Sequence, residues 1–161
     1  MKVTFTRIHK KGYSVSTDGA GIDPLKMHPA PGYDPRLPHN VAHFIVENEL
    51  GIMGGIFGQI AAGGTANTFF SEDAKNRRKA RKRGTEMMKA NKQDALFSEH
   101  AVYAAQSRWE KRDIIPDTKI PQKDLERVIV KFEEFAAQWS VLPIGGSVTL
   151  DWNPKRRRLE R

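Results

Sequence analysis

Two histidines and a glutamate in one helical segment have a spacing that suits metal ligands. His39, His43 and Glu47 recur every four residues, so a helix places their side chains on one face. A pair of imidazoles four residues apart can bind one divalent metal ion, for which zinc is the first choice. Because the full set spans about 12 Å of helix axis, we expect the ion to bind His39 with His43, or His43 with Glu47.

Such a site needs a third ligand from another part of the chain and, for hydrolysis, a general base. Asn40 occupies the position at which zinc peptidases carry their glutamate base, and its amide cannot accept a proton. Glu47 is therefore the candidate catalytic residue, with Glu49 as the alternative base. Four residues are candidates for the third ligand: Asp34, His28, Glu99 and His100.

The same polar face has simpler interpretations. Its histidines could hydrogen-bond to loops, including the proline-rich loop that precedes them. They could also serve acid-base chemistry or ligand contact without any metal ion. The pattern predicts a shared face and leaves its use open.

Positive charge is concentrated in two segments of this chain, whose net charge is +8. Residues 72–92 contain nine Lys or Arg and three acidic residues, and residues 155–161 have a net charge of +4, so the remainder is near neutral. Clusters of this kind bind phosphates by displacing counterions. The candidate residues for binding a nucleic acid or an acidic protein are Lys75, Arg77, Arg78, Lys79, Arg81, Lys82 and Arg83.

We expect any nucleic-acid binding by this helix to be nonspecific and sensitive to salt. No aromatic residue interrupts residues 75–83, so the run itself offers nothing on which bases could stack. Two alternatives stay open: the run is a solvated helix face that aids solubility, or the protein is a structural subunit without catalysis.

Composition limits the class of protein. With 39% hydrophobic and 29% charged residues in 161 positions, the chain has the composition of one globular domain. It has no cysteine, which excludes disulfides, thiol nucleophiles and thiolate metal sites. We expect a cytoplasmic protein without a membrane segment, in which residues 1–154 form a single α+β domain and residues 155–161 a basic tail.

The pattern of apolar residues predicts an α+β fold. Alternation with a period of two predicts a hairpin of residues 2–9 and 12–18 and a last strand at 148–152, whereas five prolines make residues 22–38 a loop. We expect the C-terminal strand to join the N-terminal hairpin, with four to five helices covering the sheet. The predicted helices are 38–50, a short one within 52–61, 72 to about 91, 94–112 and 122–140.

The segment from Leu37 to Glu47 reads Leu-Pro-His-Asn-Val-Ala-His-Phe-Ile-Val-Glu. Together with Gly54 to Gly58 and the late segment Trp139 to Leu150, it resembles a family of small uncharacterised bacterial proteins with a Pro-His-Asp-x-x-His-Phe motif. The family implies no activity. The segment also resembles the His-Asp-x-x-His metal element of a ubiquinone-biosynthesis protein, with Asn40 in place of the aspartate.

Overall fold

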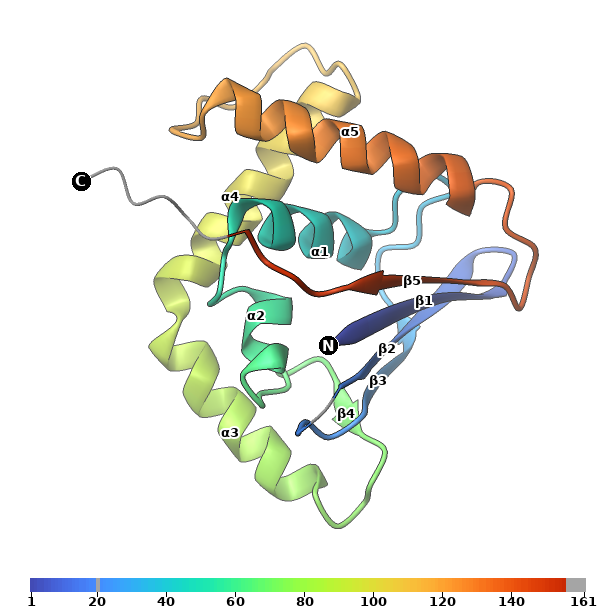
Figure 1. Ribbon diagram of the computed structural model, residues 1–161, viewed down its shortest axis with the longest axis vertical. Helices are drawn as coiled ribbons and strands as arrows, with labels where there is room; N and C mark the ends of the chain where they lie inside the picture. Colours follow the sequence, from blue (N-terminus) through green and yellow to red (C-terminus); the bar gives the residue numbers. More distant parts are fainter. Residues whose placement is uncertain (20, 156–161) are drawn as a thin grey trace.

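A five-stranded antiparallel sheet forms one layer of the protein, in a computed structural model that describes residues 1–19 and 21–155 (Figure 1). The strand order is β4-β3-β2-β1-β5 within these residues. The strands are β1 (Lys2–His9), β2 (Gly12–Asp18), β3 (Leu25–Ala30), β4 (Phe70–Ser71) and β5 (Ser147–Asp151). The predicted hairpin and its pairing with the C-terminal strand are confirmed, as is the α+β class: Phe5 lies opposite Val15 on one side and Val148 on the other.

The helices cover one face of this sheet, with α1 at their centre (Figure 1). In the described residues they are α1 (His39–Leu50), α2 (Ile56–Ala61), α3 (Arg77–Ala90), α4 (Lys92–Trp109) and α5 (Gln122–Trp139). Helix α1 contacts α2, α4 and α5, and nine of its twelve residues are buried. A helix buried on nearly every side must find partners for its polar residues inside the protein.

Aromatic rings fix α1 and α5 to the sheet. The ring of Phe5 in β1 makes edge contacts with Phe44 of α1 at 6.1 Å and with Phe135 of α5 at 5.9 Å between centroids. In α5 the apolar residues recur at three- and four-residue steps, and Phe132, Phe135 and Trp139 are buried. This amphipathic pattern is the reason why α5 could be predicted almost to the residue.

Strand β3 corrects the prediction of a loop over residues 22–38. Its Leu25, Met27 and Ala30 are buried, and Met27 lies opposite Val15 of β2. The pairing register shifts between Val15 and Tyr13, and Pro29 falls opposite that irregularity. A proline lacks a backbone donor but is tolerated where the ladder is already interrupted, so the prolines did not prevent a strand.

Helix α3 begins at Arg77, five residues later than the predicted start at residue 72. Ser71 belongs to β4, an edge strand of two residues that the sequence did not predict. Asp73 does not begin the helix but closes a turn before it, since its Oδ1 accepts a hydrogen bond from the Lys75 amide at 2.9 Å. Aspartate favours such local turns as strongly as it favours helix starts.

The end of the described chain lies against α1. The Lys155 amide donates to the carbonyl of Asn48 at 2.9 Å, and its ammonium contacts Glu49. The rest of the predicted basic tail, residues 156–161, lies outside the described residues. Among the helices that are described, none is long and apolar enough to cross a membrane.

Candidate metal centre

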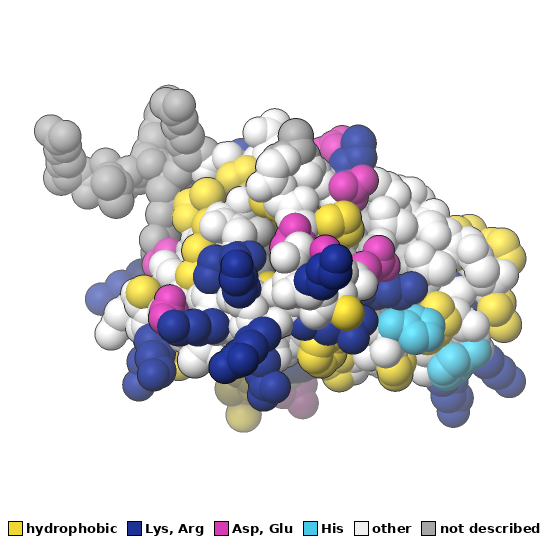
Figure 2. All heavy atoms as spheres, turned by 90° about the horizontal axis from the view of Figure 1, so that it is seen from below, with side chains coloured by type: hydrophobic (Ala, Val, Ile, Leu, Met, Phe, Trp, Pro, Cys, Tyr) yellow, Lys and Arg dark blue, Asp and Glu magenta, His cyan; other side chains and the backbone are white. Residues whose placement is uncertain are grey.

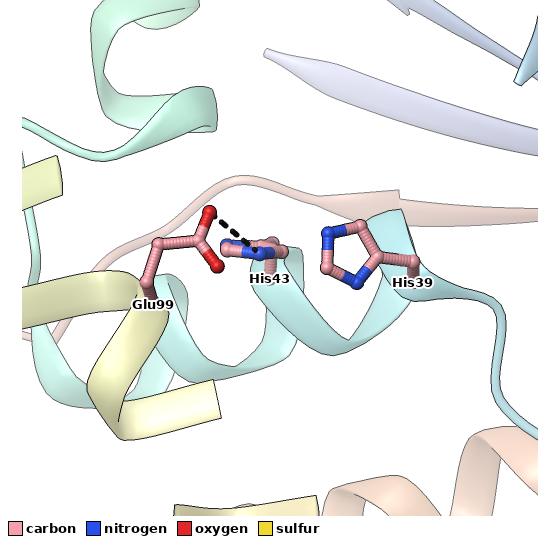
Figure 3. Close-up of side chains that lie close together, drawn as sticks. All are labelled: His39, His43 and Glu99. Carbon is pink, nitrogen blue, oxygen red and sulfur yellow. Dashed lines mark ion pairs between the residues drawn. The ribbon is translucent and has the colours of Figure 1, made fainter. Parts of the chain in front are cut away.

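Two helices bring the candidate ligands together. His39 is the first residue of α1 and His43 lies one turn later, while Glu99 projects from α4, which packs against α1. Figure 3 shows the His43 ring between the Glu99 carboxylate and the His39 ring. His39, His43 and Glu99 form the one group of three or more potential metal ligands found in the described residues, each with a ligand atom within 4.8 Å of the others.

The distances inside this cluster suit a metal ion. His43 Nε2 lies 3.5 Å from Glu99 Oε1, close to the separation of about 3.5 Å that two ligands of one tetrahedral zinc ion have. The rings of His39 and His43 meet edge to face, with centroids 4.6 Å apart. His43 is buried, whereas His39 and Glu99 are exposed on the outer side of the cluster. An ion held by these three groups would therefore keep one coordination position open to water.

A chain of hydrogen bonds fixes the His43 ring from its other nitrogen. The Ser98 hydroxyl donates to Glu47 Oε1 at 2.8 Å, so its oxygen is left to accept the Nδ1 proton of His43 at 3.1 Å. This arrangement leaves the lone pair of a neutral His43 on Nε2, on the side of Glu99. Metal-binding histidines are commonly oriented by a carboxylate or hydroxyl on the far nitrogen in this way.

Glu47 is placed on the far side of His43 from the cluster. It is 0% exposed, and its two oxygens accept hydrogen bonds from the backbone amides of Ile56 and Phe57, each at 2.8 Å. These amides begin α2, so Glu47 caps that helix. With its oxygens so engaged, the geometry favours Glu99 over Glu47 as the third ligand, and it gives Glu47 no exposed edge from which to act as a base.

Charge inside the cluster shifts the pKa values of its members. Burial alone would lower the pKa of His43, but the carboxylates of Glu47 and Glu99 raise it to about 9. Burial lowers the pKa of His39, and the nearby His43 lowers it further against the opposing charge of Glu99. The His43 imidazole in turn lowers the pKa of Glu99. A buried imidazole between two carboxylates thus retains a proton that a metal ion must displace.

The other residues proposed from the sequence have different surroundings. Asp34 accepts hydrogen bonds from the amides of Arg36 and Leu37, which makes it a loop residue. Glu49 is buried and forms ion pairs with Arg127 and Lys155. His28 lines a groove beside α3. His100, although adjacent to Glu99 and exposed, is not a member of the cluster.

Ser98 was not predicted from the sequence. A single serine in a helix has no sequence pattern that indicates its role. Ser98 contacts His43 and Glu47 because it precedes Glu99 on the turn of α4 that faces α1. The seven basic candidates of residues 75–83 are all exposed, and four of them, Arg77, Arg78, Arg81 and Lys82, line the groove that also contains His28.

Comparison with family models, with curated proteins and with solved structures finds no match for this chain. The resemblance drawn from the segment around His39 and His43 therefore stays a prediction, and the site has to be interpreted from its own geometry.

Proposed function

We propose that the protein binds one divalent metal ion, zinc first among them, through His39, His43 and Glu99, and that the ion supports a hydrolytic reaction. Two imidazoles and one carboxylate are a ligand set that zinc uses in catalytic sites. Helices α1 and α4, which pack against each other, supply this set, and the two outer ligands are exposed.

The observation that carries the proposal is the Nε2 atom of His43. It is buried and has no hydrogen-bond partner among the described residues, although a carboxylate oxygen lies 3.5 Å away. At that distance the Glu99 carboxylate forms an ion pair with the protonated His43 ring, and a metal ion would replace the proton between the two groups. The Ser98–Glu47 pair supports the same conclusion because it holds the ring in the orientation that a metal ion requires.

A bound ion would supply Lewis acidity and lower the pKa of a water molecule. The chain's own contribution is to hold His43 in a dry environment and to leave the outer side open. Neither Glu47 nor Glu49, the bases considered from the sequence, is exposed there. This favours a reaction in which the ion, rather than a separate carboxylate, activates the water.

The first test is the metal content of protein purified without a histidine tag and then titrated with zinc after chelation. We expect about one zinc ion per chain, a dissociation constant in the micromolar range or below, and loss of binding in H39A/H43A and in E99Q. The matched control is H100A, which removes an exposed imidazole next to Glu99. Each variant should keep the circular dichroism spectrum of the wild type.

The hydrolytic part of the proposal has a separate readout. The zinc-loaded protein and E99Q would be compared on activated ester and phosphate substrates at equal concentrations. Metal binding without turnover on any substrate would support the proposed metal site and contradict the proposed hydrolytic reaction. Equal zinc affinity in the wild type and H39A/H43A would contradict the proposed metal site. His43 would then be interpreted as a structural imidazolium between Glu47 and Glu99.

A further inference from the structure

A wide groove runs between α3 and the β4 edge of the sheet, separate from the metal cluster. It has a volume of about 1170 Å³, larger than most small-molecule pockets. Figure 2, which views the protein from the end where α3 and β4 lie, shows Lys and Arg side chains gathered over this face with hydrophobic atoms between them. We call this the basic groove; the residues used below are Lys26, Phe70, Arg77, Arg78, Arg81 and Lys82.

The positive charge of the basic groove is not neutralised within the protein. Five Lys or Arg residues line it, with Glu72 as the one acidic residue among those described. In the described part of the chain, no ion pair involves the four lining residues of α3 or Lys26 from β3. Arg83, which does not line the groove, by contrast pairs with Asp23 at 3.9 Å. The groove therefore retains free cations for an anionic ligand.

The spacing of these cations suits a chain of phosphates. Arg77, Arg78, Arg81 and Lys82 occupy one side of α3, spread over about 7.5 Å of helix axis. Ala80 and Gly84 are the buried residues of α3, and Ala80 also lines the groove beside these cations. Lys26 stands across the groove on β3. Cations on both walls can contact a phosphodiester backbone that runs along the groove.

An aromatic ring lies beside these cations. Phe70 in β4 is 64% exposed, lines the groove and lies opposite Lys26 in the strand pairing. Its neighbour Phe69 is buried in the core, which anchors the strand while Phe70 faces outward. The basic run contains no aromatic residue, but the fold supplies one from a different part of the chain. Ser71, which also lines the groove, has a buried hydroxyl without a hydrogen-bond partner.

We propose that the basic groove binds single-stranded nucleic acid, with phosphates on the α3 cations and Lys26 and a base stacked on Phe70. Exposed aromatic rings next to free cations are the combination by which proteins hold single strands. A duplex keeps its bases stacked on one another and would leave Phe70 unused. An acidic protein segment would use the cations but gain little from the ring, so Phe70 distinguishes the two ligands.

The test is fluorescence anisotropy with labelled oligouridylate and oligothymidylate of about 12 nucleotides, titrated at several salt concentrations. We expect binding to both, with a slope of log K against log salt of about −3 if four phosphates are contacted. Comparing the affinities for oligouridylate and oligothymidylate shows whether the groove prefers single-stranded RNA or single-stranded DNA. R77S/R78S/R81S/K82S should flatten the slope, and F70A should weaken binding roughly tenfold.

Two controls make the result specific to the basic groove. K10S/K11S/K119S/K123S removes the same number of exposed positive charges elsewhere and should keep most of the affinity. Polyglutamate of similar charge should bind at least tenfold more weakly than the oligonucleotide. If polyglutamate bound as tightly as the oligonucleotide and F70A had no effect, the proposal would be overturned in favour of an acidic protein partner. If both quadruple variants lost the same affinity, the binding would depend only on the total positive charge of the protein, which would also overturn the proposal.

Discussion

Glu47 lies where three helices meet and accepts hydrogen bonds from two of them. Its carboxylate receives two amide protons from the start of α2 and the Ser98 hydroxyl proton from α4. It also lies 3.6 Å from His43 Nδ1. A charge that is 0% exposed is tolerated because each of its oxygens has donors. The position therefore requires a group that only accepts hydrogen bonds.

We predict that E47Q destabilises the protein more than its small change in shape suggests. A glutamine keeps one acceptor oxygen but turns an NH₂ group toward amides that are themselves donors. The expected loss is roughly 2–4 kcal/mol in the free energy of unfolding, measured by urea denaturation. E86Q, at an exposed position, is the matched control and should change stability by less than about 0.5 kcal/mol. Equal stability of the two variants would contradict the role given to Glu47.

The raised pKa of His43 predicts how the stability of the metal-free protein depends on pH. The folded pKa is about 9 against 6.5 for the free side chain, so between these values the native state binds more protons than the unfolded state. The stabilisation is then complete below about pH 6.5 and is lost as the pH rises through 9. We expect the free energy of unfolding to fall by roughly 1–3 kcal/mol over this window in the presence of a chelator.

The comparison that isolates His43 is the same pH series on H43Q. Its stability should be lower at pH 6.5, and its dependence on pH between 6.5 and 9 should be nearly flat relative to the wild type. Parallel curves for the two proteins would assign the pH dependence to other groups.

Among the secondary-structure elements, the sequence pattern predicted those with strong periodicity and missed those that depend on pairing with a neighbouring strand. The alternation of β1 and β2 and the apolar stripe of α5 are local signals, and the structure follows them closely. Strand β3 has only three buried apolar positions among prolines, and β4 has two residues. Such strands form because a neighbouring strand offers an edge, which no local pattern records.

Gly84 shows how tertiary packing overrides helix propensity in α3. An alanine in the middle of a helix is favoured over glycine by about 1 kcal/mol. Here, however, a Cβ would overlap the hydroxyl of buried Thr65 and lie 3.2 Å from its Cβ and its backbone nitrogen. We predict that G84A destabilises the protein by roughly 1–3 kcal/mol, measured by thermal or urea denaturation.

The control for this prediction is the double variant G84A/T65A. Removing the hydroxyl opens the space that the new methyl group needs, so the cost of G84A should shrink by at least half in the T65A background. Additive effects would mean that the two residues do not compete for the same space. The test bears on the basic groove as well, because Thr65 lines it together with Arg77, Arg78, Arg81 and Lys82 of α3.

The sequence predicted two of the three ligands of the candidate metal site. The four-residue spacing placed His39 and His43 on one face, and Glu99 was one of four candidates for a third ligand. Choosing among those four required knowing that α4 packs on α1, a contact between residues about 55 positions apart. The role of Phe70 in the basic groove could likewise not be predicted from the sequence, because its ring lies beside the cations of α3 only once β4 has joined the sheet.

For the whole molecule, a metal ion at His39, His43 and Glu99 would join α1 to α4 and so stabilise the fold. A ligand present at 100 times its dissociation constant adds about 2.7 kcal/mol to the free energy of unfolding. We predict a rise in melting temperature of several degrees when zinc is added to chelator-treated protein. The rise should persist in H100A and disappear in E99Q; an equal rise in E99Q would show that zinc binds elsewhere.

The pairing of β1 with β5 has a consequence for how the protein is made. Strand β1 lies between two partners: β2, which follows it directly, and β5, which begins 138 positions after β1 ends at His9. During synthesis at about 5–20 residues per second, the first hairpin waits many seconds with one edge of β1 open. A nascent chain with an open strand edge is a target for chaperones and for pairing with other chains. A chain truncated after residue 146, before β5, should therefore be sensitive to protease, and the chain of 161 residues resistant.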